Sequence, residues 1–208
     1  MLDKFLTPVI KPILNPVVVV LHKRGVTADQ LTVTGFLIGM LALPLIAFAL
    51  WYGALAAIIV NRLFDGLDGA LARHAQQSSS AGGYLDITLD FLFYAAVPLG
   101  FILANPEQNA IAGALLLAAF IGTGSSFLAF AIAAEKLQLD KLQFKYKSFY
   151  YLNGLTEGTE TIALFIAFCI WPQHFVLLAG IFATACAITI FTRIHGGYHT
   201  LKQLEMSQ

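Results

Sequence analysis

Long apolar stretches separated by short polar connections dominate the pattern of hydrophobic and polar positions along this chain. A predominantly apolar stretch of about 20 residues can cross a bilayer as a helix. We therefore expect an all-α integral membrane protein with six transmembrane helices. The expected spans lie near residues 30–51, 53–74, 82–104, 108–134, 156–171 and 174–195. The second has few apolar residues before Asp65, so a hydropathy window undercounts it.

The chain before the first span has a different character. Its apolar run at residues 17–21 is short, three prolines interrupt the sequence before it, and the basic residues Lys23 and Arg24 follow it. We expect residues 1–22 to form an amphipathic helix that lies along the membrane surface. The run lacks a small-residue cleavage site, so it does not resemble a cleavable signal peptide.

Composition agrees with a single membrane domain over residues 1–208. Apolar residues make up 58% of the chain and charged residues 12%, which is typical of integral membrane proteins. A formal net charge of zero argues against a nucleic-acid partner. Both cysteines, Cys169 and Cys186, lie in apolar runs and are interpreted as buried structural thiols.

Four carboxylates interrupt the second and third expected spans, at Asp65, Asp68, Asp86 and Asp90. Ionisable groups at membrane depth cost several kcal/mol unless they are paired, hydrated or bound to a cation. Steps of three and four residues place each pair on one face of its helix. If the two helices are antiparallel neighbours, the carboxylates meet as level pairs, Asp65 with Asp90 and Asp68 with Asp86. Such a set of oxygen ligands suits Mg²⁺ or Mn²⁺.

The positive charges indicate which side of the membrane the acids face. With six spans, all lysines and arginines but Arg62 fall on one side, and the turns near residues 52, 105 and 172 carry none. Positive charges favour the cytoplasmic side. We therefore expect a multi-pass protein of the cytoplasmic (inner) membrane with both termini in the cytoplasm. The acidic residues would open toward the cytoplasm as well.

The acids belong to a longer pattern, Asp-x2-Asp-Gly-x2-Ala-Arg-x8-Gly-x3-Asp-x3-Asp. Its fixed positions are filled by Asp65, Asp68, Gly69, Ala72, Arg73, Gly82, Asp86 and Asp90. This pattern resembles the motif of the CDP-alcohol phosphotransferases, also described as CDP-alcohol phosphatidyltransferases. Residues 26–32 resemble a second element of that family, Thr-Pro-Asp/Asn-x2-Thr, with Ala28 in place of the usual proline.

The resemblance implies an activity in phospholipid biosynthesis. Members of the family transfer a substituted phosphoryl group from a CDP-alcohol, commonly CDP-diacylglycerol, to a hydroxyl acceptor, and CMP leaves. It also implies a nucleotide- and metal-binding core within residues 26–90, a homodimer, and two bound ions of Mg²⁺ or Mn²⁺. The acceptor alcohol depends on residues outside the motif.

Individual roles follow from the motif positions. Asp65, Asp68 and Asp86 are the expected metal ligands, and Asp90 is expected to ligate a second ion and to accept the proton of the attacking hydroxyl. The expected nucleotide-binding residues are Asp29, Thr32, Gly69, Ala72, Arg73 and Gly82. The small residues leave room for the nucleotide, and the planar guanidinium of Arg73 suits a phosphate. For Asp29 and Thr32, a role at the start of the helix is an equal alternative.

Several residues allow two interpretations. The lysines at 136–147 would bind either a phosphorylated acceptor or anionic lipid headgroups. Glu157 and Glu160 would either complement a helix dipole or line an acceptor pocket. For the whole chain, the alternative to an enzyme is a transporter with an acidic site. Transporters usually build such sites from broken helices in repeated halves, and no repeat is apparent in this sequence.

Overall fold

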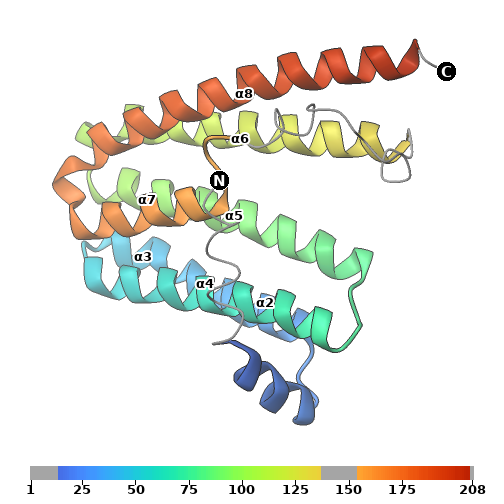
Figure 1. Ribbon diagram of the computed structural model, residues 1–208. Helices are drawn as coiled ribbons and strands as arrows, with labels where there is room; N and C mark the ends of the chain where they lie inside the picture. The colour runs from blue at the N-terminus through green and yellow to red at the C-terminus, as the bar shows by residue number, and fades with distance from the viewer. Residues whose placement is uncertain (1–13, 137–153, 207–208) are drawn as a thin grey trace.

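The computed structural model describes residues 14–136 and 154–206, and these residues are helical without strands (Figure 1). A short helix, Leu14–Lys23, comes first. The following elements are α2 (Ala28–Met40), α3 (Ala42–Ala47), α4 (Trp51–His74), α5 (Ser80–Ala104), α6 (Pro106–Lys136), α7 (Gly158–Ile170), the 3₁₀ helix η3 (Pro172–His174) and α8 (Phe175–Glu205). The expected all-α class is confirmed.

Each of the six expected spans coincides with helix, the first being divided into α2 and α3. Four stretches are both long and apolar enough to cross a membrane: Ala28–Ala47, Ser80–Ala104, Pro106–Lys136 and Pro172–Gln203. The chain is therefore a multi-pass membrane protein. Charged residues interrupt α4, and the 13 residues of α7 extend about 20 Å, less than the hydrocarbon thickness of about 30 Å. Six crossings accordingly remain a prediction.

The helix Leu14–Lys23 overlaps the second half of the expected surface helix. Val18 on this helix is 1% exposed and packs in a small apolar cluster with Leu31 and Leu71, whereas Val17 and Val20 are exposed. Apolar residues that face outward would suit the membrane interface. The part of this prediction that concerns residues 1–13 lies outside the described residues.

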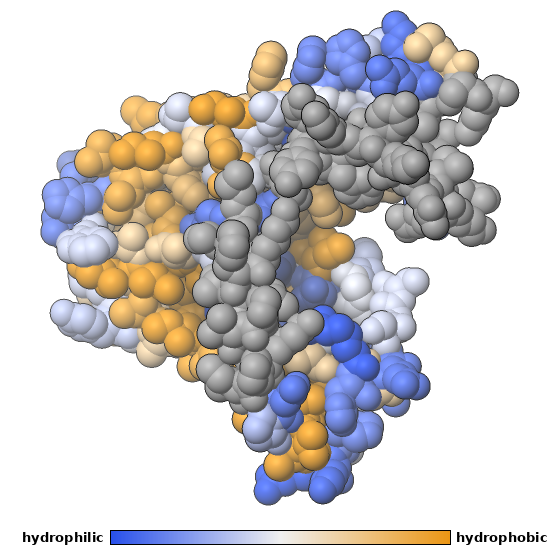
Figure 2. Space-filling view, in the orientation of Figure 1, coloured by the Kyte–Doolittle hydropathy of each residue, from blue (hydrophilic) through white to orange (hydrophobic). Residues whose placement is uncertain are grey.

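Aromatic packing joins the ends of several helices. Phe101 near the end of α5 stacks on Phe175 at the start of α8, with ring centroids 4.6 Å apart, and Phe168 of α7 contacts both rings. All three side chains are almost fully buried. Hydrophobic residues cover much of the surface outside this core, and hydrophilic ones gather where α4 leads into α5 and near the end of α8 (Figure 2).

Helices α2 and α4 pack closely because two glycines of α2 face α4. A methyl group at Gly35 would lie 2.5 Å from Cβ of Phe64, and one at Gly39 would lie 2.8 Å from Nδ2 of Asn61. Asn61 also donates a hydrogen bond from Nδ2 to the carbonyl oxygen of Gly35, at 3.1 Å. These contacts fix the register of α2 along α4.

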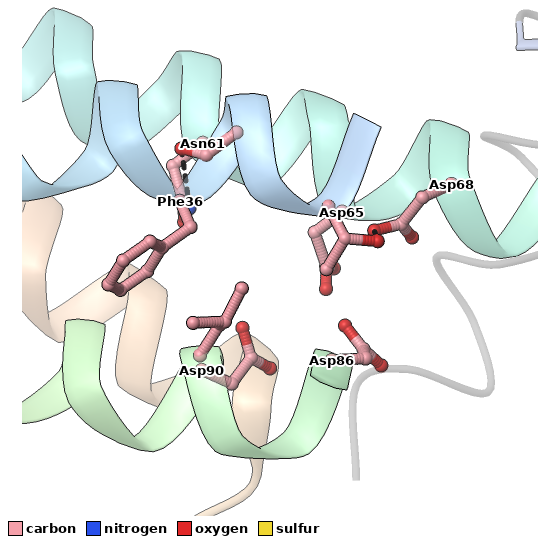
Figure 3. Close-up of a pocket in the computed structure, with 9 residues that line it drawn as sticks. Phe36, Asn61, Asp65, Asp68, Asp86 and Asp90 are labelled. Atoms are coloured by element: carbon pink, nitrogen blue, oxygen red, sulfur yellow. Dashed lines mark hydrogen bonds between the residues drawn. The ribbon is translucent and has the colours of Figure 1, made fainter. Parts of the chain in front are cut away.

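Helices α4 and α5 follow one another and run in opposite directions (Figure 1). Helix α2 packs on both of them, whereas α4 with α5 is not among the closely packed pairs of the described helices. The pairing of the carboxylates assumed that these helices are antiparallel neighbours: they are antiparallel, but each packs on α2 rather than closely on the other. Polar side chains of α4 and α5 face one another across the remaining space (Figure 3).

Candidate active site

Three of the four predicted acids form one group. Asp65 and Asp68 of α4 and Asp86 of α5 each offer a carboxylate oxygen, and these oxygens lie within 4.8 Å of one another (Figure 3). Asp68 is buried, and the other two are half-buried. All four aspartates line a small cavity of about 10 Å³. Asp90 lies one turn farther along α5 than Asp86 and is outside the group of three.

The donor set of this three-aspartate group fits a small divalent cation. Carboxylate oxygens are the preferred ligands of Mg²⁺ and Mn²⁺. In octahedral coordination at about 2.1 Å, adjacent ligands stand about 3.0 Å apart and opposite ligands about 4.2 Å apart, so oxygens within 4.8 Å of one another could gather around one ion by small side-chain movements. Three negative charges at this separation repel one another strongly in a partly buried site, and a cation would relieve that repulsion.

Arg62 partly offsets the negative charge. Its guanidinium forms an ion pair with Asp65 one turn later on α4. A single guanidinium cannot neutralise three carboxylates, so the pair leaves the site with net negative charge. This contact supports a role for Arg62 in balancing the charge of the acidic residues.

The six predicted nucleotide-binding residues come together in one groove. They line a space of about 200 Å³ between the start of α2, the end of α4 and the start of α5. The six are Asp29, Thr32, Gly69, Ala72, Arg73 and Gly82. Asp68 and Asp86 line the groove too, so it adjoins the three-aspartate group. A ligand in this groove would have direct access to a cation held by the aspartates.

Small residues keep the groove open. A methyl group at Gly82 would lie 3.2 Å from Oδ1 of Asp29, and one at Gly69 would lie 3.2 Å from a terminal nitrogen of Arg73. Both separations are tighter than ordinary van der Waals contact, so a side chain at either position would have to displace a polar group that borders the groove.

The start of α2 is capped by Thr27. Its hydroxyl accepts a hydrogen bond from the backbone of Gln30 at 3.3 Å, and the Gln30 side chain accepts one from the Thr27 backbone at 3.1 Å. This reciprocal capping box satisfies two backbone donors at the helix start. Asp29 and Thr32 are therefore not needed as caps, and both side chains border the groove.

Sequence reasoning missed some residues at the site. Gln77, Ser78 and Ser79 line the groove from the turn between α4 and α5, and Ser79 caps α5 by accepting a hydrogen bond from the Gly82 backbone at 3.0 Å. A serine directly before a helical stretch is a typical capping signal, so Ser79 was open to prediction. The hydroxyl of Tyr94, one turn after Asp90, lies 3.5 Å from Oδ2 of Asp90.

The sequence offered two candidate sites for the acceptor alcohol, the pair Glu157 and Glu160 and the lysines at 136–147. Glu157 and Glu160 form a capping box at the start of α7, in which the Glu157 backbone donates to Oε2 of Glu160 at 3.2 Å. This supports their role at the helix start. Of the lysines at 136–147, Lys136 ends α6, and the others lie outside the described residues.

Comparison with known proteins places these features in a family. The family model for CDP-alcohol phosphatidyltransferase matches residues 25–192. Inner membrane protein YnjF of Escherichia coli is 60% identical over 205 residues, which cover 99% of each chain. Archaetidylinositol phosphate synthase of Pyrococcus horikoshii is 41% identical over 107 residues, and the match covers 50% of this chain and 55% of that protein.

Solved structures show the same fold. Phosphatidylinositol phosphate synthase of Mycobacterium tuberculosis with CDP-DAG bound has a TM-score of 0.66 and 22% identity, covering 90% of this chain and 94% of that one. The same enzyme has also been solved with manganese and citrate, with a TM-score of 0.66 and 22% identity over 89% and 88% of the two chains.

Proposed function

The chain belongs to the CDP-alcohol phosphatidyltransferase family and is an enzyme of this class, and on this premise we propose its reaction. The protein transfers a phosphatidyl group from CDP-diacylglycerol to a hydroxyl acceptor and releases CMP, in a reaction that requires Mg²⁺ or Mn²⁺. The donor is consistent with the Mycobacterium tuberculosis enzyme, which was solved with CDP-DAG bound.

One observation carries the proposal. The three-aspartate group borders the same groove that gathers all six predicted nucleotide-binding residues. The six residues extend along the chain from Asp29 to Gly82, 53 positions apart, and thus contribute to one site within the proposed 26–90 core. A divalent cation beside a groove that can take up the nucleotide is an arrangement that suits cleavage of a diphosphate.

We assign Asp65, Asp68 and Asp86 as ligands of the cation, and Asp90 as a ligand of a second one. When bound, such ions neutralise diphosphate oxygens and stabilise the departing phosphate. Arg73 borders the groove on the α4 side and would bind a phosphate of the donor. Gly69, Ala72 and Gly82 would let the nucleotide approach the helix backbones closely.

Asp90 is the proposed proton acceptor. The acceptor oxygen forms a bond to the phosphorus that carries diacylglycerol, and the bond from that phosphorus to the bridging oxygen breaks, so that CMP leaves. The hydroxyl proton passes to the Asp90 carboxylate. Asp90 suits this role because it lines the cavity but stands apart from the three-aspartate group.

The cellular setting is part of the proposal. The Escherichia coli relative is named as an inner membrane protein, and the positive charges of this chain favour cytoplasmic termini. The groove would then open toward the cytoplasm, where soluble CMP can leave. Residues 1–208 would act as a single domain, and we expect two copies to form a homodimer, which light scattering of the purified protein can test.

Release of CMP is the direct test. The protein is purified in mild detergent and mixed with CDP-diacylglycerol labelled in the cytidine, Mg²⁺ or Mn²⁺, and a panel of alcohols and phosphorylated alcohols. We expect labelled CMP to appear with at least one acceptor, together with the matching phospholipid. Absence of CMP with every acceptor, combined with transport of a substrate by reconstituted protein, would support the transporter instead.

A further inference from the structure

We propose that Thr32 is a positioning residue for the metal site: its hydroxyl orients the Asp68 carboxylate toward the three-aspartate group. This inference rests on the proposed function, because it assumes that Asp68 ligates a cation. It changes the role of Thr32, which sequence comparison assigns to contact with the nucleotide.

The hydroxyl of Thr32 has two acceptors within reach but only one proton. Oγ1 lies 2.6 Å from Oδ2 of Asp68 and 3.1 Å from the backbone oxygen of Ala28. Hydrogen bonds to carboxylates are shorter and roughly twice as strong as neutral ones. The proton therefore points to Asp68. The other possible acceptor, the backbone oxygen of Ala28, is a neutral carbonyl one turn earlier in α2.

Burial makes this hydrogen bond important for Asp68. Asp68 is 6% exposed, so water has little access to its carboxylate. A carboxylate offers about four lone-pair directions, and a bond to one oxygen leaves enough of them to bind a cation. Hydrogen bonds of this kind hold metal-binding carboxylates in one orientation, and losing them typically weakens metal binding about 10-fold to 100-fold.

The register between α2 and α4 places Thr32 at Asp68. Going backward along α2, Gly39 faces Asn61, Gly35 faces Asn61 and Phe64, and Thr32 reaches Asp68. Because the two helices are antiparallel, residue numbers fall along α2 as they rise along α4. Thr32 therefore lies on the same face of α2 as the two glycines, next to Asp68. Helix α2 thus acts on a metal ligand without contributing a carboxylate of its own to the three-aspartate group.

The test measures metal binding directly. Equilibrium binding of Mn²⁺ to detergent-purified protein is followed by electron paramagnetic resonance for Thr32→Val, which keeps the shape but lacks the hydroxyl, and for Thr32→Ser, which keeps the hydroxyl. We expect Thr32→Val to raise the Mn²⁺ Kd by about 10-fold or more and Thr32→Ser to stay within about 3-fold of the parent protein.

Thr34→Val is the matched control. Thr34 is exposed on the same helix, and its hydroxyl donates to the Gln30 backbone at 2.7 Å without lining the cavity or the groove. It should leave the Mn²⁺ Kd unchanged. Thermal unfolding of the metal-free variants shows whether any change in Kd accompanies a loss of folding.

Each outcome decides the question. An unchanged Mn²⁺ Kd in Thr32→Val, with an increased KM for CDP-diacylglycerol, would overturn the inference and assign Thr32 to the nucleotide. A Thr32→Ser variant as weak as Thr32→Val would overturn it as well, because the hydroxyl would then not be the cause. If the parent protein binds no Mn²⁺, the proposed function fails together with this inference.

Discussion

The side-chain amide of Asn61 in α4 donates a hydrogen bond to the backbone oxygen of Gly35 in α2, at 3.1 Å, and Asn61 is 6% exposed. A buried polar side chain needs such a partner, because an unsatisfied amide costs about 1–3 kcal/mol. The pair fixes α2 against α4 one turn from the acidic residues. The geometry of the site thus depends on a contact between two residues that line the cavity without contributing a carboxylate.

Gly35→Ala should disturb both folding and metal binding. The added methyl would lie 2.5 Å from Cβ of Phe64, so α2 and α4 must separate. Overpacking of this kind typically costs about 1–3 kcal/mol. We expect a lower Tm in detergent and a higher Mn²⁺ Kd. The control is Gly180→Ala in α8, where a methyl meets nothing within 4 Å; an equal loss in both variants would argue against the contact as the cause.

Asp65→Asn and Asp86→Asn should abolish CMP release. Each replaces a carboxylate of the three-aspartate group by a neutral amide, which is a poor ligand for Mg²⁺ or Mn²⁺. The variants should remain folded and monodisperse in detergent, whereas Glu107→Gln, an exposed position at the start of α6, should behave as the parent protein. Retention of more than roughly a tenth of the activity would remove that aspartate from the ligand set.

Asp90→Asn should lower turnover while leaving metal binding at the three-aspartate group almost unchanged. Asp90 lies outside the three-aspartate group, so Mn²⁺ binding at that group should change little. Loss of a general base typically lowers turnover about 10²-fold to 10⁴-fold. Steady-state CMP release and Mn²⁺ titration on the same preparation test this prediction. A parallel loss of both quantities would instead make Asp90 an essential ligand of the same ion.

Arg73→Gln should weaken binding of CDP-diacylglycerol more than binding of the metal ion. The guanidinium borders the groove and lies against Gly69, where a phosphate of the donor would be within reach. A hydrogen bond to a charged group contributes about 1.5–3 kcal/mol, so the KM for CDP-diacylglycerol should rise by about 10-fold or more. The Mn²⁺ Kd should be unchanged. If the KM for the donor stays constant while that for the acceptor rises, Arg73 belongs to the acceptor site.

Much of the site was predictable because it depends on spacing within single helices. Asp65 and Asp68 share a face of α4 by their three-residue step, and Gly82 and Asp86 share one of α5 by their four-residue step. Four of the six expected spans correspond to apolar runs long enough to cross a membrane, whereas the spans at α4 and α7 do not. These are local properties, which a sequence displays directly.

Other features depend on how helices rotate and pack, which spacing does not determine. The sequence suggested two level pairs of carboxylates, whereas Asp90 lies outside the group that Asp65, Asp68 and Asp86 form. The hydrogen bond from Thr32 to Asp68 spans 36 positions and arises because α2 packs on α4. Only the three-dimensional arrangement reveals that Thr32 of α2 contacts a residue of the proposed metal site.

Removal of the divalent cation tests the central claim most directly. Purified protein is treated exhaustively with a chelator, and CMP release from CDP-diacylglycerol is measured before and after a graded return of Mn²⁺ or Mg²⁺. The proposed site predicts complete loss of CMP release and its recovery along the same curve as direct Mn²⁺ binding. Full activity after exhaustive chelation would contradict a catalytic cation held by Asp65, Asp68 and Asp86.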